Sequence, residues 1–168
     1  PMGVGKTEAA LYAAYRLMAK GIHHGLYFAL PTRLTSDRIH ERVGNFLSRI
    51  SEVPVAAKLA HGAAWLHDCR WRPEEDEAHV ARVHPWFNPS KRALLYPYAV
   101  GTIDQALLSV LNVKHSFVRL FGLAGKVVIL DEVHSYDMYT GTLLDELVDR
   151  LRKVGCTVII LSATLTGS

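Results

Sequence analysis

The chain has 168 residues, of which 49% are hydrophobic and 21% are charged, and its formal net charge is +3. This composition is typical of a globular domain with a sizeable core, and it excludes a disordered chain. No apolar run approaches the roughly 20 residues of a membrane span, so we expect neither a span nor a signal peptide. Cys69 and Cys156 cannot make a disulfide framework, and we expect a reducing, cytoplasmic setting.

The first third of the chain predicts helix, strand and helix. Alanine and leucine recur at helical spacing over residues 6–21, and Gly21 is a good helix C-terminal residue. The apolar residues 25–31 indicate a buried strand, which Pro31 ends. Residues 35–50 predict an amphipathic helix. The apolar face of that helix carries Ile39, Val43, Phe46, Leu47 and Ile50.

The middle of the chain changes character. A second strand is predicted within residues 53–62, and residues 62–97 then indicate an irregular excursion from the sheet. This excursion holds all three tryptophans, which we expect to anchor it to the core. His79 and His84 have a spacing found in zinc sites, but Cys69 stands alone, so we expect no metal site there.

Regular alternation resumes after the excursion. Strands are predicted at residues 98–102, 125–134 and 156–164, and helices at 103–113 and 139–155. The apolar run that starts the middle strand is typical of a strand buried on both faces, and the final strand is also expected to be buried. Strands that alternate with helices predict an α/β fold with a mostly parallel sheet and right-handed crossovers.

The opening stretch carries the second half of a phosphate-binding loop. Gly5, Lys6 and Thr7 complete the pattern G-x-x-x-x-G-K-[ST], whose first position falls before the chain begins. Glycines such as Gly3 and Gly5 let backbone N–H groups surround phosphate oxygens at a helix N-terminus. Lys6 then reaches the β- and γ-phosphates, and the Thr7 hydroxyl ligates Mg²⁺. We add Glu8 to this nucleotide-binding set; the alternative is a glycine-rich turn before an ordinary helix.

A second motif ends the strand predicted around residues 127–130. Asp131 at the carboxyl end of that strand can hold Mg²⁺ through water, and Glu132 can orient and deprotonate an attacking water. We therefore predict Lys6, Asp131 and Glu132 as the catalytic residues, with Thr7 and Asp131 at the metal. The alternative is a buried strand that ends in two solvated acids.

A third motif follows the last strand. Ser162 and Thr164 offer two short hydroxyl groups beside the end of the Asp131 strand. Serine and threonine at a strand terminus are often only turn formers, so this motif has weight only in combination with the other two.

The three motifs GKT, DEVH and SAT, in this order, resemble motifs I, II and III in the first RecA-like domain of superfamily 2 helicases. A narrower resemblance, from Pro1 to about Thr166, points to the CRISPR-associated DEVH-box helicase–nuclease of type I systems. The stretches that carry it are FALPTRLTSDRIHERV, VGTIDQALLSVL, KHSFVRLFGLAGKVVILDEVHSYDMY and VIILSATL.

The resemblance implies roles for residues outside the nucleotide site. Pro31, Thr32 and Arg33 match motif Ia, and Gly101 and Thr102 match the Ib region. Both segments hold the backbone of single-stranded nucleic acid in such motors, and contacts of this kind position a strand without reading its sequence.

The same resemblance implies a coupling role for three residues. His134 of the DEVH box, with Ser162 and Thr164, would link the nucleotide site to the nucleic-acid groove.

The function implied for the parent protein is ATP-driven, 3′→5′ translocation on single-stranded DNA in CRISPR interference, with ATP and Mg²⁺ as cofactors. An RNA-guided surveillance complex recruits such a motor, which feeds DNA to a separate HD nuclease domain. The alternatives are another DExH-box motor, either an RNA helicase or a restriction-type translocase, or an inert nucleotide-binding module.

We expect residues 1–168 to be part of a first RecA-like domain that lacks the strand before the phosphate-binding loop. A second RecA-like domain would supply an arginine finger, and its absence predicts negligible ATP turnover by this chain alone.

Overall fold

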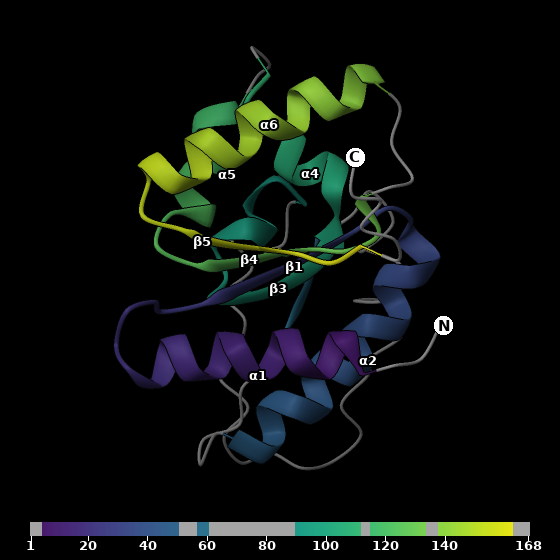
Figure 1. Ribbon diagram of the computed structural model, residues 1–168, viewed down its shortest axis with the longest axis vertical. Coiled ribbons are helices and arrows are strands. Elements are labelled where there is room, and N and C mark those ends of the chain that lie inside the picture. Colours follow the sequence, from purple (N-terminus) through teal and green to yellow (C-terminus); the bar gives the residue numbers. More distant parts are fainter. Residues whose placement is uncertain (1–4, 51–56, 61–89, 112–114, 134–137, 163–168) are drawn as a thin grey trace, which may run out of the picture.

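The computed structural model describes one parallel sheet with helices on both faces (Figure 1). The residues that it describes are 5–50, 57–60, 90–111, 115–133 and 138–162. Within these ranges, no helix is long and apolar enough to cross a membrane.

Eleven elements make up this part of the chain. In chain order they are α1 (Lys6–Ala19), β1 (Leu26–Leu30), α2 (Arg33–Ile50), β2 (Lys58–Ala60), the 3₁₀ helix η2 (Ser90–Leu95), β3 (Tyr98–Thr102), α4 (Ile103–Leu107), α5 (Ser116–Leu123), β4 (Val127–Leu130), α6 (Met138–Lys153) and β5 (Thr157–Ile160).

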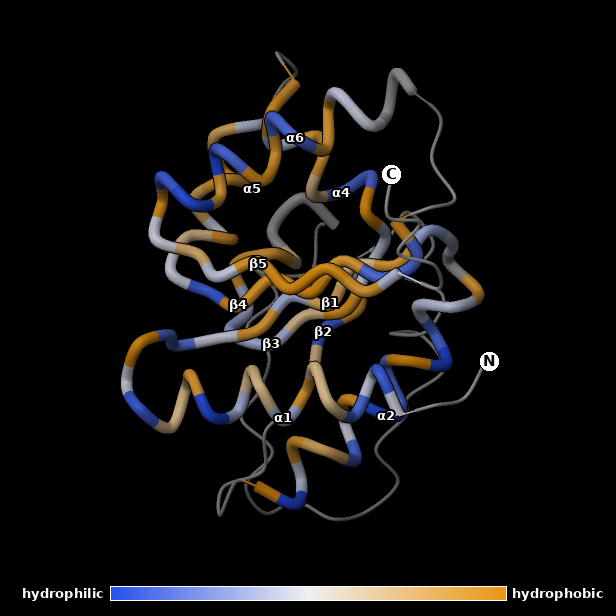
Figure 2. Tube along the Cα trace, in the orientation of Figure 1, coloured by the Kyte–Doolittle hydropathy of each residue, from blue (hydrophilic) through white to orange (hydrophobic). Residues whose placement is uncertain are grey.

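The strand order is β2-β3-β1-β4-β5, and every neighbouring pair is parallel. Helices α1 and α2 cover one face, and α4, α5 and α6 cover the other (Figure 1). All residues of β1 and β4 are buried, which is why these strands consist mainly of apolar residues. Figure 2 shows orange segments in the central strands of the sheet. The α/β fold predicted from the sequence is confirmed.

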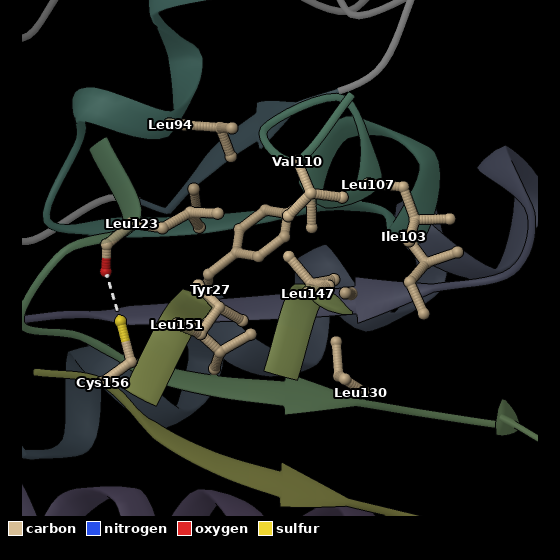
Figure 3. Packing of buried hydrophobic residues seen from close by; sticks show 14 of the residues in the cluster. Tyr27, Leu94, Ile103, Leu107, Val110, Leu123, Leu130, Leu147, Leu151 and Cys156 are labelled. Atoms are coloured by element: carbon tan, nitrogen blue, oxygen red, sulfur yellow. Dashed lines mark hydrogen bonds between the residues drawn. The ribbon is translucent and has the colours of Figure 1, made fainter. Parts of the chain in front are cut away.

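Side-chain alternation along the strands divides the core into two clusters. Tyr27 and Leu130 face α4, α5 and α6, where they meet Leu147 and Leu151 (Figure 3). On the other face, Leu26, Phe28, Val127 and Ile129 meet the buried residues of α1 and α2. Each face of the central strands therefore holds one set of helices in place.

The helices predicted in the first third are confirmed. The chain leaves α1 through Gly21, whose φ of 70° lies in the left-handed region that glycine adopts without strain. The predicted face of α2 is turned to the core, where Ile39, Val43 and Leu47 are buried.

Three expectations need correction. Among the described strands, β5 lies at the edge of the sheet and pairs only with β4, so it is only partly buried, and Ile160 is 51% exposed. The helix predicted at 103–113 already ends at Leu107. Helix α5 was not predicted, because apolar residues lie on both of its sides: Leu123 is buried, whereas Phe117 is 77% exposed.

Gly25 is predicted to tolerate no side chain. A Cβ atom there would lie 2.3 Å from the Pro97 carbonyl oxygen, which accepts a hydrogen bond from Leu26 N–H. We expect Gly25→Ala to destabilise the chain by about 1–3 kcal/mol or more in thermal or urea unfolding. Gly44→Ala in the interior of α2 is the matched control, since nothing lies within 4 Å of its Cβ position. Gly44→Ala should raise the free energy of unfolding by about 0.5–1 kcal/mol. Equal effects of the two substitutions would contradict the close approach of Gly25 to the Pro97 carbonyl oxygen.

Lys126 is buried immediately before β4. Its ammonium group donates hydrogen bonds to the Leu94 carbonyl oxygen at 2.6 Å and to that of Tyr96. Burial lowers the pKa of Lys126 from 10.5 to about 7. Between these values the unfolded chain binds the proton and the folded chain releases it, so stability rises with pH. Burial raises the pKa of the nearby Cys156 thiol, which acts in the opposite direction above about pH 9.

Lys126 should therefore add up to about 1.4 kcal/mol of stability per pH unit between about pH 7 and 9. We expect Lys126→Met to remove this slope in urea unfolding at pH 7, 8 and 9, although the two carbonyl groups then lose their donor. Lys153→Met, at an exposed position of α6, should keep the wild-type slope. Identical slopes for wild type and Lys126→Met would contradict the assignment.

Candidate nucleotide and nucleic-acid site

The predicted motifs meet at one edge of the sheet because four parallel strands end level with one another. Leu30 is in register with Thr102, and Leu130 is in register with Ala29 and Ile160. The ladder continues one residue further, since Asp131 N–H donates to Ala29 O at 2.9 Å. The polar residues that follow these strands are therefore brought to the same edge.

Lys6 joins motif I to motif III. Its ammonium group donates a hydrogen bond to the backbone carbonyl oxygen of Ser162 at 2.9 Å, across 156 positions of the sequence. Lys6 is the first residue of α1, and Gly5 before it has a φ of 69°, a left-handed conformation that favours glycine. The start of α1, with its unpaired N–H groups and positive dipole end, thus lies beside the carboxyl end of β5.

Asp131 and Glu132 follow β4 at the same edge. Asp131 is half-buried, and its carboxylate accepts a hydrogen bond from Glu132 N–H at 2.9 Å. Glu132 is exposed, and its φ of 54° places a non-glycine residue in the left-handed region. Such a conformation is uncommon outside glycine and concentrates at functional sites. At Glu132 the backbone therefore departs from the extended conformation of β4, which ends at Leu130.

The residues at this edge suit a magnesium ion that is shared with a bound phosphate. Thr7 supplies a hydroxyl group and Asp131 a carboxylate, which are oxygen ligands that Mg²⁺ accepts. Among the described residues, no group of three or more His, Cys, Asp or Glu side chains could hold a metal by itself. A cation here would therefore complete its shell with water and ligand oxygens.

Glu8 is engaged by a partner that the motif did not indicate. Its carboxylate accepts a hydrogen bond from the guanidinium group of Arg42 on α2. That contact is the main reason why the pKa of Glu8 is lowered. Arg42 lies in the charged part of an amphipathic helix, and no local pattern distinguishes it from its neighbours.

Thr32 caps the start of α2. Its hydroxyl oxygen accepts a hydrogen bond from Thr35 N–H at 3.3 Å, and its carbonyl oxygen accepts one from the Ser36 hydroxyl at 2.9 Å. Pro31 and Thr32 thus form the turn between β1 and α2, at the same edge as Asp131. Arg33 begins the helix.

Gly101 and Thr102 lie at the carboxyl end of β3 and are buried. The Thr102 carbonyl oxygen accepts a hydrogen bond from the buried Tyr27 hydroxyl at 2.8 Å, and Thr102 precedes α4 as its N-cap residue. The hydrogen bond from Tyr27 and the start of α4 therefore hold the backbone of Thr102, and with it the Ib segment, in place. Its predicted contact with nucleic acid stays a prediction.

Several predicted positions lie outside the described residues. They are Gly3 of the loop, His134 of the DEVH box, Thr164 of motif III, the Arg33 side chain and the Trp- and His-rich residues 62–89. Among the described residues of the predicted site, Lys6, Asp131, Glu132 and Ser162 lie at the same edge as Pro31, Thr32 and Thr102.

Comparison with known proteins agrees with this arrangement. The DEAD/DEAH box helicase model matches residues 1–168. The chain belongs to this helicase family. It is 49% identical over 178 residues to the CRISPR-associated endonuclease/helicase Cas3 of Thermus thermophilus. This alignment covers 100% of this chain and 19% of that protein. The helicase chain thus spans about a fifth of the length of this relative.

Solved structures give the same result. The crystal structure of T. fusca Cas3 has a TM-score of 0.84 and 44% identity to the helicase chain, and the match covers 98% of this chain and 18% of that one. A chain in a structure of a CRISPR RNA-guided surveillance complex, pre-nicking, has a TM-score of 0.66 and 39% identity to the helicase chain, and the match covers 98% of this chain and 15% of that one. The RecA-like fold and the resemblance predicted from the sequence are confirmed.

The Thr32 cap predicts a measurable contribution to the stability of the helicase chain. We expect Thr32→Ala to lower the free energy of unfolding by about 1 kcal/mol, because the N–H of Thr35 loses its acceptor. Thr32→Ser keeps the hydroxyl group and should stay close to wild type in the same urea titration. A loss of equal size in both variants would show that the hydroxyl group does not act as a cap.

Proposed function

We propose that this domain binds ATP with Mg²⁺ at the edge formed by Lys6, Asp131 and Glu132, and that it drives a DNA motor. The single observation that carries the proposal is the contact between Lys6 and the Ser162 carbonyl oxygen, at the edge where both acids lie. A lysine, a helix N-terminus and two carboxylates at one edge of a sheet are suited to bind and hydrolyse a nucleoside triphosphate. Crystal structures of T. fusca Cas3 with ADP, AMPPNP and ATP, to which this chain is similar, support the choice of nucleotide.

In the proposed mechanism, each described residue has one task. Lys6 leaves Ser162 and neutralises the β- and γ-phosphates, while the start of α1 donates N–H groups to them. Thr7 and, through water, Asp131 would hold Mg²⁺, which neutralises the charge that develops on the phosphates. Glu132, which is exposed just after β4, would accept a proton from the attacking water.

The proposed substrate of the motor is single-stranded DNA. Pro31, Thr32 and Arg33, with Gly101 and Thr102, would hold its backbone beside the nucleotide, since β1 and β3 end at the same edge as β4. Contacts of this kind do not depend on base sequence, which suits a translocating protein. His134, Ser162 and Thr164 would connect the two sites.

The proposed parent protein acts in CRISPR interference. An RNA-guided surveillance complex would load it, a second RecA-like domain would close over the nucleotide, and an HD nuclease domain would cut the strand. Relatives named as CRISPR-associated endonuclease/helicase, and the likeness to a chain of a surveillance complex, support this role.

The proposal predicts ATP turnover by the complete parent protein that single-stranded DNA stimulates. Glu132→Gln should lower the turnover number by about 10²-fold or more, because the general base is lost. Lys6→Ala should abolish turnover. Phosphate release with DNA, with RNA of the same sequence, or without nucleic acid measures both points.

Glu146→Gln is the matched control, since Glu146 is an exposed carboxylate of α6 that pairs with Arg150 one turn away. It should keep wild-type turnover. Stimulation by RNA but not DNA would move the protein to the RNA helicases. Absence of turnover in the intact parent would favour an inert nucleotide-binding module.

A further inference from the structure

The first turn of α1 is attached on two sides. Lys6 and Glu8 are two positions apart, so their side chains leave the helix about 200° from each other. Lys6 contacts the Ser162 carbonyl oxygen after β5, and Glu8 contacts Arg42 on α2. The turn predicted to bind phosphate is therefore connected to both motif III and α2.

The pair of Glu8 and Arg42 lies over the region where α1 and α2 share one core cluster. Leu11 of α1 and Val43 of α2 are both buried in that cluster. Arg42 directly precedes Val43, so its backbone is fixed by core packing while its guanidinium group reaches the edge of α1. A displacement of α2 would therefore move the guanidinium group of Arg42 and change its contact with Glu8.

Helix α2 also extends to the segment predicted to hold nucleic acid. Thr32 caps its first turn through Thr35 and Ser36, and Arg42 lies ten residues further along. Ten residues of helix span about 15 Å, and α2 continues without interruption from Arg33 to Ile50. A strand that binds at Thr32 therefore acts on one rigid body, which carries Arg42.

The exposure of the pair sets the size of the effect. The Arg42 and Glu8 side chains are 48% and 60% exposed, so their attraction is largely screened by water and salt. Pairs of this kind change an equilibrium by about two- to fivefold at most. The pair is too weak to hold the fold together, but it is sufficient to bias the position of one helical turn.

We propose that Arg42 is a positioning residue that couples nucleic-acid binding at the start of α2 to the phosphate-binding turn of α1 through Glu8. This inference rests on the proposed function, because it assigns a path between the two sites of that motor. It predicts that substitution of Arg42, which lies outside the nucleotide-binding set, reduces stimulation by DNA and leaves ATP hydrolysis without DNA nearly unchanged.

Charge reversal in the complete parent protein tests this coupling. Arg42→Glu should lower the ratio of DNA-stimulated to basal ATP turnover by about two- to fivefold, with basal turnover and the KM for ATP close to wild type. Glu8→Arg should lower the same ratio. The double variant, with the charges exchanged, should recover most of the wild-type ratio, and the double-mutant cycle isolates the pairwise effect.

Arg49→Glu is the control, since it makes the same charge change in the last turn of α2. It should keep the wild-type ratio, and all variants should unfold within a few degrees of wild type. A wild-type ratio in Arg42→Glu, or a double variant no better than the worse single variant, would overturn the coupling while the motor function stands. Lack of DNA stimulation in the wild-type protein would overturn both proposals.

Discussion

The parallel pairing of β1 with β3 and β4 is the constraint on which the rest of the structure depends. Both neighbours of β1 run in its direction and in aligned register, so every strand of this group ends at one edge. Parallel strands need crossover connections, and these place helices on both faces. The buried side chains of β1 and β4 then hold those helices, so the positions of α1 and α2 follow from the same pairing.

The two edges of the sheet are built differently. At the amino ends, polar groups satisfy one another inside the protein. Lys126 donates to carbonyl oxygens before β3, and the buried His23 is hydrogen-bonded to Gly125 O at 3.1 Å and to the Thr157 hydroxyl at 2.7 Å. At the carboxyl ends, Lys6 and Glu132 are exposed. The amino ends of the strands are thus packed inside the protein, whereas the carboxyl ends carry exposed polar groups. Such an exposed carboxyl edge suits ligands that bind and are released.

Much of the fold could be predicted because the hydrophobic pattern of most segments agrees with the burial of their side chains in the structure. The run of apolar residues in β1 and the periodic face of α2 each point to one structure, and each is found. The partial exposure of β5 does not follow from its local pattern, since Val158 and Ile159 have the same apolar character as residues of a central strand. Helix α5 could not be predicted from a hydrophobic pattern, because its apolar residues do not all face the core. The helix packs against η2 and buries Leu123, but Phe117 is exposed.

The sequence by itself indicated the chemistry proposed for this protein, because the glycines, the lysine and the paired acids of its motifs must occur in a fixed local order. It also determined that strands and helices alternate, since hydrophobic periodicity is a local property. Only the tertiary structure decided which distant groups meet. The contacts of Lys6 with Ser162 and of Glu8 with Arg42 join positions 156 and 34 residues apart, and strand order and helix packing bring them together.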